Sequence, residues 1–235
     1  MYRQYMRPLI AIVAVLALAA IATLASAARS GPVALPPLPT PTLRVWDWPA
    51  AAPTDRPIAS HPELLSGFII PVGGADVPTD DLYLPNSPRE YRAGYHEGID
   101  FPVKAGTPVL AAKAGTIVRI DNAYTEWTVA DEQVAFADAQ ALGYTPAAVL
   151  DRIRGRQVWV DHGAGVVTRY AHLSEVAPLG VGDAVAQGEV IGAVGSSGYP
   201  EGGPHLHFEI RVGEDFYGDG LPLPQLRHAI GAAFR

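Results

Sequence analysis

The sequence contains no cysteine. This absence excludes disulfide bonds, thiolate metal sites, a cysteine nucleophile and a lipid anchor on cysteine. A metal ion bound to this chain therefore needs nitrogen and oxygen ligands. Basic residues are also scarce, because 17 Lys and Arg stand against 24 Asp and Glu, for a formal net charge of −7. Since the sequence has no basic cluster of the kind that binds phosphates, we expect no nucleic-acid partner.

Long apolar runs are absent except near the N-terminus. There, Arg3 and Arg7 precede an almost unbroken apolar run from Leu9 to Leu24, which leads into Ala-Ser-Ala at 25–27. This pattern is typical of an export signal, so we predict a signal peptide over residues 1–28. Because the run approaches the roughly 18–20 apolar residues that span a bilayer, an uncleaved signal anchor over residues 8–27 is the alternative. We expect an exported protein, extracellular or in the cell wall or envelope, whose membrane contact is limited to this segment.

Removal of residues 1–27 takes away two arginines and no acids, so the formal charge changes from −7 to −9 and 208 residues remain. That length suits one sizeable core, and we expect a single domain and a monomer. Prolines spaced through small residues predict a semi-extended linker over 29–60. The domain then covers 61–215, and residues 216–235 form a C-terminal extension.

Short apolar segments rich in β-branched and aromatic residues recur through the domain and are bounded by Gly, Pro or Asp. They predict strands, and the frequent turns between them favour antiparallel sheets in a mainly β fold. The segments are GFIIPV, TPVLAA, GTIVRI, RQVWVDHG, GVVTRYAHL, EVIGAVG and HLHFEIRV.

Residues 130–154 interrupt this rhythm with two helical patterns, so we predict a small helical insertion between two strands. Asp131 is the expected cap of the first helix, which should end at Gly143. Thr145, with Pro146 just inside, is the expected cap of the second helix.

Seven histidines occur, and four of them fall with one aspartate into three short motifs: HEGID (His96, Asp100), RYAHLS (His172) and GPHLHFEI (His205, His207). Residues two apart share a face in a strand and point apart in a helix. His205 and His207 can therefore converge on one site if HLHFEI is a strand.

HEGID begins like the His-Glu-x-x-His helix of metalloproteases, which raises the question whether Glu97 is a catalytic base. Gly98 in its middle and Pro102 shortly after it disfavour a helix. We therefore expect HEGID to be a strand, in which His96 and Asp100 share a face. Glu97 would then point to the opposite face, out of reach of a metal bound by the other two.

These three motifs, in this order, resemble the lysostaphin-type or LytM-type zinc endopeptidases of peptidase family M23. Flanking phrases are similar too: GIDFPVKAGTPVLAAKAGTIV, VDHGAGVVTRYAHLS and QGEVIGAVGSSG. The resemblance covers roughly residues 66–122 and 156–212, and it implies the lysostaphin-like fold, an antiparallel two-sheet β core.

Carried over residue by residue, the resemblance makes His96, Asp100 and His207 the ligands of Zn²⁺, and it makes His172 and His205 the catalytic pair. Three protein ligands leave one coordination position open, as a catalytic zinc site requires. The implied substrate is the peptide of bacterial peptidoglycan, cut at a stem peptide or cross-bridge. An elastin-like or other Gly-rich protein is the alternative substrate. A latent or non-catalytic LytM-type module that binds the wall and regulates other hydrolases is the alternative function.

Several other residues receive a structural interpretation. His61 and His228 are expected to be surface or hydrogen-bonded structural groups, and His162 a turn or strand-end residue. Tyr170, two residues before His172, can either assist the oxyanion or pack across strands. The insertion at 130–154 can form a wall of the substrate groove that the resemblance implies, cover that groove, or pack on the back of a sheet.

Overall fold

The computed structural model describes residues 65–235, so the predicted signal segment, the linker and His61 lie outside the described residues. Within this part of the chain, no helix has the length and apolar character needed to cross a membrane. The strands are β1 Pro88–Arg89, β2 Gly94–Tyr95, β3 Ile99–Phe101, β4 Pro108–Leu110, β5 Gly115–Asp121, β6 Gln157–Asp161, β7 Val166–Ala171, β8 Leu173–Val176, β9 Ala184–Val185, β10 Val190–Val194, β11 Leu206–Val212 and β12 Asp215–Phe216. The helices are α2 Val129–Leu142, α3 Ala147–Arg154 and α4 Leu223–Ala233, with 3-10 turns η2 Asp81–Tyr83, η3 Glu90–Arg92 and η4 Pro200–Gly202.

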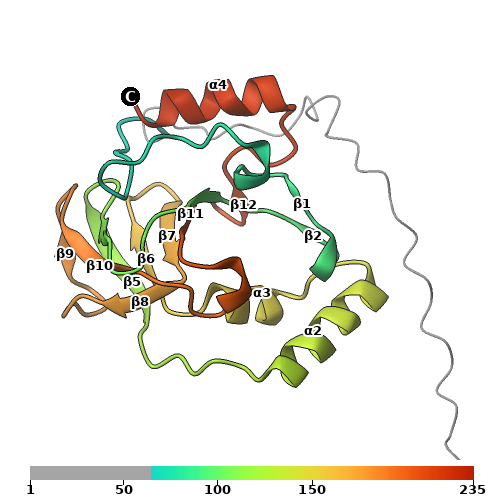
Figure 1. The fold of residues 1–235 in the computed structure, drawn as a ribbon. Coiled ribbons are helices and arrows are strands. Elements are labelled where there is room, and N and C mark those ends of the chain that lie inside the picture. Colours follow the sequence, from blue (N-terminus) through green and yellow to red (C-terminus); the bar gives the residue numbers. More distant parts are fainter. Residues whose placement is uncertain (1–64) are drawn as a thin grey trace, which may run out of the picture. The chain divides into compact units, whose positions relative to one another are not determined.

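Two antiparallel sheets build the β core, as predicted (Figure 1). The larger sheet has the order β12-β11-β7-β6-β5-β9, with β3 also paired to β11. The smaller sheet has the order β4-β10-β8, and β1 and β2 form a separate hairpin. The mainly β fold with a small helical insertion is therefore confirmed.

One face of strand β11 packs on the core, and its other face carries His207 and Glu209. Its even-numbered residues point into the core, where Phe208 is fully buried against Phe101, Tyr170 and Phe234 at ring-centroid distances of 6.5, 5.3 and 6.1 Å. Burial of a side chain of this size stabilises a fold by about 1.5–3 kcal/mol. Because side chains alternate along a strand, this packing presents the odd-numbered residues of β11 on the other face.

The helical insertion forms α2 and α3, but its caps differ from those expected. Thr128, not Asp131, is the N-cap of α2; Asp131 occupies the third helical position and completes a capping box with Thr128. The helix ends at Gly143 as predicted, in the left-handed conformation that favours glycine. Pro146 is the N-cap of α3, and Thr145 does not cap it, because its hydroxyl donates to the carbonyl of Arg92 instead.

The predicted strand GFIIPV is wrong. Only Val72 makes a bridge, to Val109, and the rest of the segment has no regular structure. Its backbone amides bond to separate partners: the amide of Phe68 donates to the carbonyl of Ala233 and that of Ile69 to Ala112. Pro71 has no amide hydrogen, so a continuous ladder cannot form through it.

Candidate metal centre

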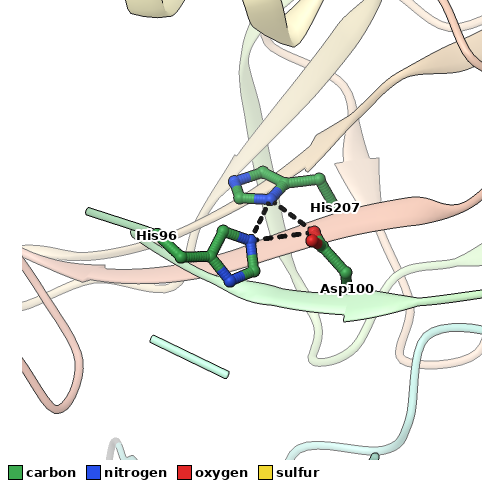
Figure 2. Close-up of side chains that lie close together, drawn as sticks. All are labelled: His96, Asp100 and His207. Carbon is green, nitrogen blue, oxygen red and sulfur yellow. Dashed lines mark hydrogen bonds and ion pairs between the residues drawn. The ribbon is translucent and has the colours of Figure 1, made fainter. Parts of the chain in front are cut away.

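His96, Asp100 and His207 come together in one buried cluster (Figure 2). The distance from His96 Nε2 to Asp100 Oδ1 is 2.9 Å, and that from His207 Nδ1 to Asp100 Oδ1 is 2.8 Å. The two imidazole nitrogens are 3.0 Å apart. These are the atoms that can face one metal ion.

Sheet register places two of the three residues. Asp100 on β3 and His207 on β11 are direct partners in the antiparallel pair. Gly98 permits this close approach, because a Cβ there would lie 2.4 Å from the carbonyl oxygen of Phe208. His96 departs from the prediction, since it precedes β3 and is outside any regular strand. Backbone hydrogen bonds of 2.8 Å to residues 86 and 87 hold it in place instead.

Neighbouring acceptors decide which ring nitrogens carry protons. His96 Nδ1 donates to the carbonyl of Leu84 at 3.0 Å, and His207 Nε2 donates to Glu209 Oε1 at 3.1 Å. The lone pairs of His96 Nε2 and His207 Nδ1 then both face the carboxylate oxygen of Asp100. Three electron-rich atoms within 3.0 Å of one another require a positive charge among them. A proton or a metal ion supplies it.

The direction of the pKa changes agrees with a site that attracts a cation. Burial alone raises the pKa of Asp100, but His96 and His207 hold it well below its ordinary value. Burial lowers the pKa of His96 to about 4, so this imidazole is neutral at neutral pH. For His207, burial opposes protonation, but Asp100 and Glu209 outweigh it and raise the pKa. A metal ion bound here would displace the proton that His207 and Asp100 otherwise share.

His172 and His205, the predicted catalytic pair, lie beside the ligand cluster. Their ring centroids are 4.6 Å apart, and that of His172 lies 5.7 Å from that of His207. Each donates from Nδ1 to a backbone carbonyl, of Ser197 and Gly203 respectively, at 2.9 Å. In its neutral form each ring therefore has Nε2 as its acceptor atom, and Nε2 of His205 is 3.8 Å from Asp100 Oδ1. Two further imidazole rings thus lie next to the candidate ligand atoms.

The backbone of His172 has an uncommon conformation. It lies between β7 and β8 with φ of 61°, in the left-handed region, and it is only 4% exposed. Non-glycine residues in this region are strained and often functional. Burial, with His205 and His207 nearby, holds the pKa of its ring well below the ordinary value, so the ring is neutral at neutral pH and can accept a proton.

The five residues border one groove, with a volume of about 390 Å³. Leu150, Ile153 and Arg154 from α3 line it, so the insertion forms a wall of the groove. Tyr199 and Gly202, between β10 and β11, line another part, and the rings of Tyr199 and Tyr91 stack 5.4 Å apart. The groove has aromatic, apolar and cationic groups around the candidate ligand atoms.

Glu97 lines the same groove but is not part of the ligand cluster. Its carboxylate pairs with Arg154 and Arg211, and within residues 65–235 it makes no hydrogen bond to His96, Asp100 or His207. The expected strand alternation is replaced by an irregular segment, but the consequence is the same. Glu97 has the role of an ion-pair partner.

Glu97→Gln is therefore expected to lower kcat/KM less than about tenfold, whereas loss of a general base costs 100- to 10,000-fold. Glutamine still offers an oxygen to both arginines. The rate of peptide hydrolysis measures this, with Glu175→Gln, an exposed glutamate on β8, as the control. A loss of 100-fold or more would restore Glu97 as the base.

The other singled-out residues lie outside the cluster. Tyr170 is fully buried, its ring packs on Phe208 across the strands, and its hydroxyl accepts from the amide of Ala112 at 2.7 Å. Packing is therefore its role. His162 bonds to Ala114 and Thr168, and His228 is exposed on α4.

Three residues around the site were missed from the sequence: Arg89, Glu209 and Arg154. Arg89 Nη2 donates to Asp100 Oδ2 at 3.1 Å and so leaves Oδ1 for a metal. Glu209 could have been found, because it continues the two-residue spacing of His205 and His207 on the strand face. Arg89 and Arg154 carry no local signal, since only the folded chain brings them to the site.

Comparison of the sequence with known proteins identifies its family. The model of peptidase family M23 matches residues 94–218, more than half of the chain. The chain belongs to peptidase family M23. The resemblance seen in the sequence is thus confirmed, and it places the chain in a family of peptidases.

Two curated relatives are similar to part of this M23 chain. It is 36% identical over 142 residues to DD-carboxypeptidase/endopeptidase Mpg of Neisseria meningitidis serogroup B, which covers 59% of this chain and 26% of that protein. It is 31% identical over 125 residues to peptidoglycan DD-endopeptidase ShyA of Vibrio cholerae, which covers 53% of this chain and 22% of that protein. The match thus spans about a quarter of these relatives.

Among solved structures, the catalytic domain of lysostaphin from Staphylococcus simulans is similar at 29% identity and a TM-score of 0.37. That match covers 57% of this chain and 80% of that one.

Proposed function

We propose that this chain is an exported zinc metalloendopeptidase that hydrolyses peptide bonds of bacterial peptidoglycan, in the stem peptide or cross-bridge. The observation that carries the proposal is the convergence of His96 Nε2, Asp100 Oδ1 and His207 Nδ1, beside the imidazole rings of His172 and His205. The names of Mpg and ShyA support the substrate class. The basic and apolar start of the sequence supports export.

The donor set fits zinc. Two imidazole nitrogens and one carboxylate oxygen are common zinc ligands at about 2.0–2.2 Å, and tetrahedral geometry then separates ligand atoms by roughly 3.3 Å. The present separations of 2.8–3.0 Å need to widen by only a few tenths of an ångström. One hydrogen bond orients each ligand toward the common point: His96 donates to Leu84, His207 donates to Glu209, and Asp100 accepts from Arg89.

When bound, zinc supplies a Lewis acid that acidifies water and polarises a carbonyl oxygen. The chain's own contribution is proton transfer and orientation. With Nδ1 bonded to a backbone carbonyl, the neutral ring of His172 or His205 can take a proton from the attacking water at Nε2. Once protonated, either ring can donate to the developing oxyanion or to the leaving amine.

Incubation of the full chain with defined muropeptides, with and without a chelator, tests this function. We expect new amino termini, detected by mass analysis, that disappear with chelator and with an Asp100→Asn variant. Their masses name the bond. Retention on peptidoglycan without any cleavage would favour the regulatory binding module, and cleavage of Gly-rich proteins alone would favour the other substrate.

A further inference from the structure

Arg154 is the last residue of α3 and lies at the end of the helical insertion. Although charged, it is only 7% exposed. A buried guanidinium is costly unless it is paired and hydrogen-bonded. Its partners therefore indicate why an arginine stands here.

The side chain of Arg154 reaches a metal-ligating histidine through one carboxylate. Arg154 Nε donates to Glu209 Oε1 at 2.6 Å, and His207 Nε2 donates to the same oxygen at 3.1 Å. Glu209 is fully buried. Because an ionised carboxylate only accepts, this contact fixes the proton on Nε2 and leaves Nδ1 to face the metal.

The other contacts of Glu209 are longer. Its second oxygen, Oε2, lies 3.4 Å from Arg169 Nη1 and 3.3 Å from Arg211 Nη1. Arg154 is thus the closest cation to Glu209 and the one that shares an oxygen with His207. Its other arm pairs with Glu97, next in sequence to His96. One guanidinium therefore joins the segments that carry His96 and His207.

The main chain at Arg154 holds the predicted catalytic histidine. The carbonyl of Arg154 accepts from the amide of His172 at 2.8 Å. The next residue, Gly155, packs so tightly on Ser197 that a Cβ would lie 2.3 Å from the carbonyl oxygen of Ser197. That oxygen accepts from His172 Nδ1. The end of α3 therefore fixes both the backbone and the ring of His172.

We propose that Arg154 is a positioning residue through which the helical insertion sets the orientation of zinc ligand His207, by way of Glu209, and supports His172. This inference rests on the proposed zinc function. It assigns the insertion a part in the reaction beyond forming a wall of the groove. Within residues 65–235, the side chain of Arg154 bonds to Glu209 and Glu97 and makes no hydrogen bond to His96, Asp100 or His207.

Two measurements on the purified full chain separate this role from a merely structural one. The first is zinc affinity, by competition with a chelator. The second is the imidazole Nε2–H proton signal of His207 in the zinc-loaded protein, which persists in NMR spectra only while a hydrogen bond protects it from exchange. The variants are Arg154→Gln, Arg154→Lys and Glu209→Gln. Asp151→Asn is the matched control, because it breaks an ion pair of α3 with Arg119 away from the groove.

Arg154→Gln is expected to weaken zinc binding about 10- to 100-fold and to weaken the protection of the His207 proton, as loss of an outer hydrogen-bond partner usually does. Arg154→Lys should recover part of the affinity, since a single ammonium keeps the charge but cannot fork to both carboxylates. Asp151→Asn should match the unchanged protein in both measurements.

If Arg154→Gln binds zinc as tightly as Asp151→Asn does, with the His207 proton equally protected, the inference is overturned. Should Arg154→Gln fail to fold by circular dichroism, Glu209→Gln decides by the same two criteria. Absence of zinc from the unchanged protein would instead contradict the proposed function, and this inference with it.

Discussion

Replacement of His207 by alanine is expected to abolish zinc binding and to lower peptide hydrolysis by at least about 1000-fold. The loss of one of three ligands leaves two groups that cannot retain the ion, and a Lewis acid supplies several kcal/mol of transition-state stabilisation, with 1.36 kcal/mol for each tenfold in rate. Metal analysis should find about one zinc per unchanged chain and almost none in the variant.

His228→Ala is the matched control, because it removes an exposed imidazole from α4 and leaves the buried cluster intact. It should retain both zinc and activity. A His207→Ala protein that keeps its zinc would remove His207 from the ligand set, and the convergence with Asp100 would then need another explanation.

Replacement of His172 by asparagine is expected to leave zinc stoichiometry unchanged and to lower kcat by about 100- to 10,000-fold, the contribution of a general acid–base group. KM should change little, because the ring transfers protons and does not hold the substrate. Asparagine is chosen because it tolerates the left-handed backbone at this position, where φ is 61°.

The asparagine amide can also donate to the carbonyl of Ser197, which in the unchanged protein accepts from the His172 ring. The variant should therefore fold normally, and the thermal unfolding midpoint checks this. His162→Asn removes a histidine outside the groove and serves as the control. An unchanged kcat in folded His172→Asn would exclude His172 from proton transfer.

The meeting of the five predicted site residues at one groove could be foreseen, because their signals are local. Spacing of two on a strand brings His205 and His207 to one face, and the register of β11 with β3 adds Asp100 opposite His207. Gly98 indicated the lack of a helix, and the structure gives the reason, which is close contact with the carbonyl of Phe208. The letters of HEGID thus predicted which side chains meet.

Features that depend on distant parts of the chain could not be foreseen. GFIIPV has the composition of a strand, but its hydrogen bonds go to the end of α4 and to residue 112. Capping at Thr128 was missed because Asp131 offered an equally good side chain three residues later. The contacts of Arg89 and Arg154 with the site have no sequence pattern at all. They arise when the β1–β2 hairpin and the insertion pack around the groove.

The position of zinc in crystals of the loaded protein, located by its anomalous scattering, tests the proposed metal site most directly. The structure predicts one peak within about 2.0–2.2 Å of His96 Nε2, Asp100 Oδ1 and His207 Nδ1, and hence coordination of His207 through Nδ1, with Nε2 bonded to Glu209. A peak elsewhere, or coordination through Nε2 of His207, would contradict the proposed metal site.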